Sequence, residues 1–153
     1  MRATYGQVKN VLEAATKFHR DLEQLYGQLA AKATRQGVRM LLDYMSRDER
    51  HFEQALVEMQ SEHQEKLLEA WMQYEPDDRV LDVPHAEELR DGMTVDDILE
   101  LALRLDEKLV VFYTQAAQLA ELPEVKDLFT RLAEQQEDRR REFKVNVLLT
   151  QST

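Results

Sequence analysis

Apolar residues recur every three or four positions along most of the chain, which is the spacing of one face of an α-helix. The pattern breaks near 34–37, so a first helix is expected before this point and a second after it. No glycine or proline falls between Val38 and Glu75, and the pattern therefore predicts one very long second helix. Two further helices are expected after the next break, and Pro123 suits the first turn of the last one.

Residues 76–93 interrupt the helical pattern. Pro76 and Pro84 fall there among acidic side chains, which is typical of an irregular connection. Thr94 followed by Asp97 resembles a capping box at the start of the third helix, with Asp in the usual place of Glu.

Two short loops and one long connection predict an all-α fold, a four-helix bundle of two helical hairpins joined by a long crossover. We expect a single domain over 1–153, with a first hairpin at about 7–75, the crossover at 76–93 and a second hairpin at about 94–150. The small number of glycines and prolines, 4 and 3, agrees with long helices.

The two hairpins also repeat in sequence at a shift of 87 residues, the separation of Tyr26 and Tyr113 (113 − 26). Amphipathic helices share leucines at any offset that is in phase, but a shared Tyr, a shared Gln and an equal loop length favour a duplicated hairpin. The identical pairs at this shift include Leu12/Leu99, Glu13/Glu100, Ala15/Ala102, Leu22/Leu109, Gln28/Gln115, Ala30/Ala117, Ala33/Ala120, Val38/Val125 and Leu41/Leu128.

Composition restricts the classes of function. The chain has 43% hydrophobic and 33% charged residues, no cysteine and a formal net charge of −10. The acidic balance argues against nucleic-acid binding, and no apolar run approaches the roughly 18 residues of a membrane span. The absence of cysteine excludes thiolate metal sites and cysteine nucleophiles. No secretory signal is recognised at the N-terminus, so a cytoplasmic protein is expected.

Polar residues occupy positions where the helical pattern calls for apolar ones. His19, Glu49 and Asp106 each lie four residues after one apolar residue and three before another, which places them on inward faces of three helices. Gln136 and Arg139 fill the corresponding gap in the fourth helix. Buried charges are costly unless partnered, so these groups are expected to meet. The expected network is His19, Tyr26, Glu49, Asp106, Tyr113, Gln136 and Arg139.

The sequence resembles the ferritin-like superfamily, especially its rubrerythrin-type members. The resemblance rests on the stretches LYGQLAAKA and FYTQAAQLAELPEVKDLFTRLAEQQ, and it covers roughly 8–56 and 95–147. Such proteins build a di-metal carboxylate site from one Glu on the first helix of each hairpin and an E-x-x-H motif on each second helix. The resemblance implies iron or manganese, and chemistry with oxygen, peroxide or stored iron.

Placed on this sequence residue by residue, that site is degraded. The resemblance puts His19 and Asp106 in the places of the two single Glu residues. The first motif reads ERHF (49–52), with Phe in place of His, and the second reads QEDR (136–139), with neither ligand. The resemblance therefore implies the fold more strongly than the activity.

Two hypotheses follow for the polar residues. In the first, the network holds no metal and the Arg139 guanidinium neutralises Glu49 and Asp106, because Arg can bridge two carboxylates and cannot ligate a cation. In the second, His19, Glu49 and Asp106 hold a single Fe, Mn or Zn ion. We favour the first hypothesis, in which the protein has no cofactor and serves as a non-catalytic binding or structural module. The second implies a metal-binding protein or an oxidoreductase, which leaves open whether the chain is an enzyme.

Two further alternatives concern the second helix. A π-bulge would turn Asp48 and His51 inward as a D-x-x-H pair, although the ungapped repeat disfavours it. Beyond Met59, apolar residues that include Trp71 form a stripe that packs either under the crossover or against a second copy. Because an unpaired stripe is unusual on a monomer, a homodimer is expected.

Overall fold

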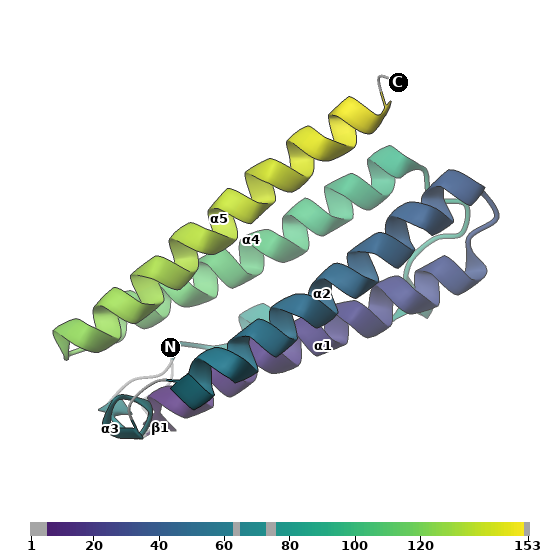
Figure 1. Ribbon diagram of the computed structural model, residues 1–153. Helices are drawn as coiled ribbons and strands as arrows, with labels where there is room; N and C mark the ends of the chain where they lie inside the picture. Colours follow the sequence, from purple (N-terminus) through teal and green to yellow (C-terminus); the bar gives the residue numbers. More distant parts are fainter. Residues whose placement is uncertain (1–5, 63–64, 73–75, 152–153) are drawn as a thin grey trace.

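The computed structural model describes residues 6–62, 65–72 and 76–151, and four long helices make up most of this part of the chain (Figure 1). Each hairpin consists of two antiparallel helices, and the two hairpins lie side by side. The prediction of an all-α bundle of two hairpins joined by a long crossover is confirmed. The long helices are α1 (Val8–Lys32), α2 (Gln36–Glu62), α4 (Val95–Leu119) and α5 (Pro123–Gln151).

The two hairpins have matching boundaries. Helices α1 and α4 each contain 25 residues, and adding 87 to the bounds of α1 gives those of α4. The same shift carries Gln36, the first residue of α2, onto Pro123, the first residue of α5. Equal helix and loop lengths are what a duplicated hairpin would produce.

The predicted start of α4 is confirmed. Thr94 Oγ1 accepts a hydrogen bond from the Asp97 amide at 3.2 Å, and Asp97 Oδ2 accepts one from the Thr94 amide at 2.9 Å. This reciprocal pair satisfies two amide groups that have no partner within the helix.

The prediction of one long helix to Glu75 is wrong, because α2 ends at Glu62. The chain then forms a short helix, α3 (Glu65–Leu68), and turns back. Strand β2 (Trp71–Met72) pairs antiparallel with β1 (Gly6–Gln7), with Gly6 opposite Met72. The turn buries Met72 to 3% exposure at the end of α1, whereas a continued helix would carry this side chain into solvent. Residues 73–75 lie outside the described part of the chain.

The crossover runs from one end of the bundle to the other and packs on α1 and α4 (Figure 1). Its short 3₁₀ helices, η1 (Asp78–Leu81) and η2 (Ala86–Glu88), each bury one apolar side chain. Lys32 Nζ donates to the Ala86 carbonyl at 2.9 Å, and Lys108 Nζ donates to the Asp82 carbonyl at 2.8 Å. These bonds hold the crossover against the first helix of each hairpin.

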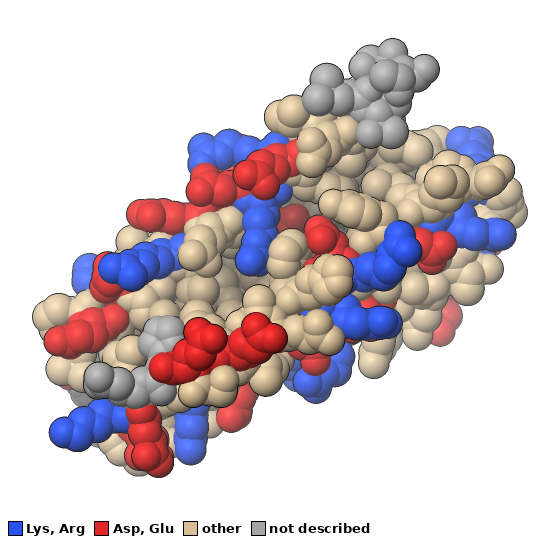
Figure 2. Space-filling model, viewed as in Figure 1, with Lys and Arg blue, Asp and Glu red and all other residues tan. Residues whose placement is uncertain are grey.

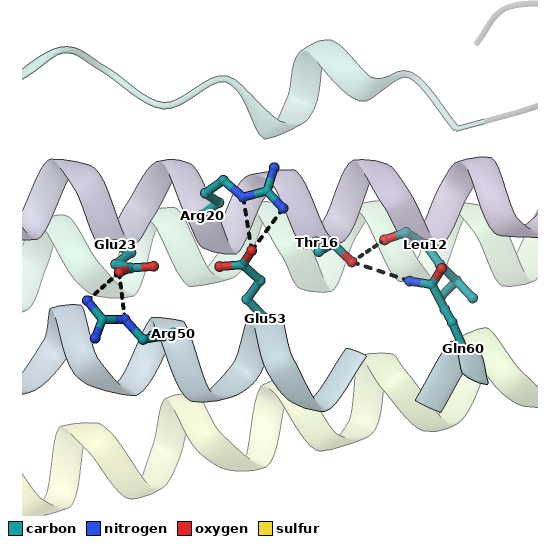
Figure 3. A network of polar contacts seen from close by, with 7 residues as sticks. All are labelled: Leu12, Thr16, Arg20, Glu23, Arg50, Glu53 and Gln60. Atoms are coloured by element: carbon teal, nitrogen blue, oxygen red, sulfur yellow. Dashed lines mark hydrogen bonds and ion pairs between the residues drawn. The ribbon is translucent and has the colours of Figure 1, made fainter. Parts of the chain in front are cut away.

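Ion pairs and hydrogen bonds set the register of α1 against α2 (Figure 3). Arg20 of α1 reaches Glu53 of α2 at 2.9 Å, and Arg50 of α2 reaches Glu23 of α1 at 2.8 Å. Ser46 Oγ also donates to the Glu23 carbonyl at 2.9 Å. The two ion pairs run in opposite directions across the interface between α1 and α2.

Acidic and basic side chains are interspersed over the face that carries α2 and α5 (Figure 2). Among the described residues, no helix combines the length and the apolar character needed to cross a bilayer.

Candidate polar site between the hairpins

The site begins with a buried pair between α1 and α2. His19 Nδ1 donates to Glu49 Oε2 at 2.6 Å, and the two residues are 1% and 6% exposed. The Phe52 ring meets the imidazole edge-on, with 5.7 Å between ring centroids. Both inward positions are as the spacing predicts, and the pairing satisfies a carboxylate that burial would otherwise penalise.

Two more carboxylates, Asp48 and Asp106, stand near Glu49. Burial raises the pKa of Asp106 well above its usual range, and the Glu49 charge raises it further. Burial and Glu49 also raise the pKa of Asp48. Like charges in a shielded space favour the protonated form, so burial and the Glu49 charge act on Asp106 in the same direction.

A cavity of about 40 Å³ lies among these carboxylates. The Tyr26 hydroxyl is buried beside it and has no hydrogen-bond partner in the described part of the chain. Burial, followed by the charges of Asp106 and Glu49, raises the pKa of Tyr26. The space is large enough for an ordered water, the usual partner of such a group. The lining residues are Tyr26, Met45, Asp48, Glu49, Phe52, Ala102, Asp106, Gln136, Arg139 and Phe143.

The prediction that Arg139 bridges Glu49 and Asp106 is wrong in its geometry. The guanidinium carbon lies 3.8 Å from the centroid of the Phe52 ring, and no described carboxylate forms an ion pair with Arg139. A stacked guanidinium gains cation–π attraction. Its positive charge still acts on the smaller cavity, where it partly offsets the rise that burial and Glu49 give the pKa of Asp48 and Asp106.

A second cavity, of about 250 Å³, lies on the other side of this stack. Phe52, Gln136 and Arg139 border both cavities and separate them. Tyr113 and Gln136 are 2% and 3% exposed, yet no described residue hydrogen-bonds their side chains. The residues that line this cavity are His19, Phe52, Ala55, Leu56, Met59, Tyr113, Leu132, Gln135, Gln136 and Arg139.

Helix α2 is regular from Gln36 to Glu62, so the bulge that would turn Asp48 and His51 inward together is absent. His51 is exposed. Asp48 nevertheless lines the smaller cavity without a bulge, and sequence reasoning missed this. The signal was available, because Asp48 lies three residues after Met45 and four before Phe52 and so borders the inward stripe.

His19 pairs with Glu49 but borders only the larger cavity, whereas Asp106 borders only the smaller one. Within the described ranges, no three His, Asp or Glu side chains are arranged to hold a metal ion.

The fold is similar to that of solved structures. A protein from Thermotoga maritima, provisionally described as a ferritin-like diiron-carboxylate protein, aligns with a TM-score of 0.64 over 92% of this chain and 94% of that chain, at 13% sequence identity. A hypothetical protein from Pyrococcus furiosus aligns with a TM-score of 0.52 over 93% and 89% of the two chains, at 18% identity. No family model and no curated protein sequence matches. The chain therefore has a ferritin-like fold.

Proposed function

We propose that this protein is a ferritin-like bundle without a functional di-iron centre, and that it serves as a non-catalytic binding or structural module. One observation carries the proposal: the Arg139 guanidinium is stacked 3.8 Å from the Phe52 ring. The resemblance to rubrerythrin-type proteins puts a metal-binding His at both of these positions. A guanidinium has no lone pair to offer a metal and stays protonated, so it opposes a second cation nearby.

The remaining side chains support the same conclusion. A di-metal carboxylate centre uses four carboxylates and two imidazoles from the bundle core. The core of this chain offers His19, Glu49 and Asp106 at the equivalent positions, with Gln136 in place of the fourth carboxylate. Asp48 adds a carboxylate at the border of the inward face of α2. Even with Asp48, these side chains do not provide the ligands that two metal ions need.

Elemental analysis of protein purified without chelator tests the proposal. We expect less than stoichiometric Fe, Mn and Zn in a protein that is folded by circular dichroism. A matched variant restores the missing ligands through His19→Glu, Phe52→His, Gln136→Glu and Arg139→His, and we expect it to gain Fe or Mn binding that the wild type lacks. Stoichiometric metal in the wild type that is lost in His19→Ala would refute the proposal.

A second candidate is a metal-binding protein or an oxidoreductase whose metal site has fewer ligands than a di-iron centre. One observation favours it. Three carboxylates and the unpartnered Tyr26 hydroxyl surround the smaller cavity. Similarity to a protein described as diiron-carboxylate suggests iron as the metal to test first. Titration with Fe²⁺ under argon, compared between the wild type and Asp106→Asn, distinguishes a metal site from a protonated carboxylate cluster.

A further inference from the structure

The charged groups of the bundle core are unevenly placed around the two cavities. Asp48, Glu49 and Asp106 all border the smaller cavity. No acidic residue borders the larger one, whereas the Arg139 guanidinium borders both. The lining of the larger cavity thus contains one cationic side chain and no carboxylate.

The polar groups that line the larger cavity include several that can donate hydrogen bonds, from Tyr113, Gln136 and Arg139, and His19 borders it as well. Tyr113 and Gln136 are 2% and 3% exposed as residues, and no described residue hydrogen-bonds their side chains. The stack on Phe52 occupies one face of the Arg139 guanidinium and leaves the N–H groups at its edge for a carboxylate. A bound acceptor would give these groups hydrogen-bond partners within the protein.

The rest of the lining is apolar, and the cavity is accessible. Leu56 is 7% exposed and Leu132 is 8% exposed, and they form an apolar wall between α2 and α5. Ala55 and Gln135 also line the cavity but are exposed, so its mouth opens between these two helices. A dry engineered cavity of about 150 Å³ takes benzene, so about 250 Å³ leaves room for a ring and a carboxylate.

We propose that the larger cavity binds a small monocarboxylate with an apolar body about the size of a benzene ring. The edge of the Arg139 guanidinium holds the carboxylate, Tyr113 and Gln136 donate to it, and the body lies against Leu56 and Leu132. This inference rests on the proposed function, because a metal centre would require a different group at position 139.

The test uses benzoate as the probe, with benzyl alcohol and benzylamine as neutral and cationic controls, on the full chain. We expect benzoate to bind at least about tenfold more tightly than either control, because charge-assisted hydrogen bonds are the stronger ones. Titrations followed by NMR should shift the methyl signals of Leu56 and Leu132. Equal affinity for the three probes, or no shift of these signals with benzoate, would overturn the proposal in favour of a cavity filled by water alone.

Variants locate the site. Arg139→Gln should weaken benzoate binding about tenfold and leave benzyl alcohol binding nearly unchanged. The matched control is Arg141→Gln, since Arg141 is exposed on the same helix and pairs with Asp138. Ala55→Leu, at an exposed helical position on the mouth, should weaken both probes and keeps the test decisive if Arg139→Gln fails to fold. Unchanged benzoate affinity in Arg139→Gln or in Ala55→Leu would contradict the assignment.

Metal content measured on the same samples separates this inference from the proposed function. Bound metal together with benzoate binding overturns the proposed function and leaves the ligand site standing. Metal-free protein that does not bind benzoate overturns the ligand site and leaves the proposed function standing.

Discussion

His19 and Glu49 form a buried hydrogen-bonded pair that links α1 to α2 at the centre of the bundle. Both side chains are buried, and they are 2.6 Å apart. Removing either one leaves the other without its partner in the buried core, a loss that typically costs about 3–5 kcal/mol. The pair therefore fixes the packing of α1 on α2, whether or not it adds net stability.

We expect His19→Leu and Glu49→Leu each to lower the free energy of unfolding by about 3–5 kcal/mol. The double variant should lose clearly less than the sum, because no unpaired polar group remains. Urea denaturation of the four proteins measures the coupling. Additive losses would show that the two residues act independently.

Asp106 makes stability depend on pH. Its folded pKa is raised by burial and by Glu49, so between the unfolded and folded values the native state holds a proton that the unfolded state has lost. Stability from this group is therefore present at low pH and is lost as pH rises through that interval. Asp106→Asn should be more stable than the wild type near pH 8, with the difference shrinking towards about pH 4.

Urea midpoints measured at several pH values check this dependence. Asp127→Asn provides the control, since Asp127 is an exposed carboxylate paired with Arg131, and its offset from the wild type should vary little with pH. An Asp106→Asn offset that grows towards low pH would contradict the raised pKa.

At the scale of the element, α4 shows how local sequence positions a site residue. The capping box of Thr94 and Asp97 sets where the helix starts, and the helical repeat then directs Asp106 inward three turns later. We expect Thr94→Ala to cost about 1 kcal/mol of stability through loss of the cap. Thr114→Ala is the matched control, because Thr114 is exposed within the same helix and bonds only the Val110 carbonyl.

Thermal unfolding followed by circular dichroism compares the two variants. Thr114→Ala should be neutral or slightly stabilising, since Ala has the higher helix propensity. The hydrogen bond that Thr114 Oγ1 donates to the Val110 carbonyl adds no stability to the helix, so its loss has no cost. Equal destabilisation of both variants would mean that the cap contributes nothing beyond a generic loss of side-chain contacts.

For the whole molecule, the end that carries β1 and β2 is the candidate surface for self-association. Trp71 is 65% exposed on β2, next to the buried Met72. A large exposed aromatic ring of this kind is more usual in an interface than on a free surface. We propose that two copies associate through this end, as expected for the commonest symmetric oligomer.

Trp71 is the only tryptophan of the chain, so its fluorescence reports on this end alone. Quenching by iodide should be strong in dilute protein and should weaken as concentration rises and the copies associate. Trp71→Ser should abolish the dimer in sedimentation velocity without unfolding the monomer, whereas Val111→Ser, at an exposed position on α4, should not. A wild type that stays monomeric at all concentrations would end this proposal.

By itself, the sequence determined the helices, the two hairpins, the crossover and the inward positions of His19, Glu49 and Gln136. These follow from local rules, because helical periodicity and caps depend on neighbours within a few residues. The fold class and the resemblance to ferritin-like proteins followed from the same patterns.

Only the tertiary structure decided which groups the polar side chains contact and which cavity each of them borders. The end of α2 at Glu62, the stack of Arg139 on Phe52 and the approach of Asp48 to the smaller cavity depend on groups from different helices. The partner that a long side chain contacts depends on distance, charge and shielding from water. These are set only when all four helices are packed. The grouping of three carboxylates around the smaller cavity, with Arg139 between the two cavities, is therefore a property of the packed bundle.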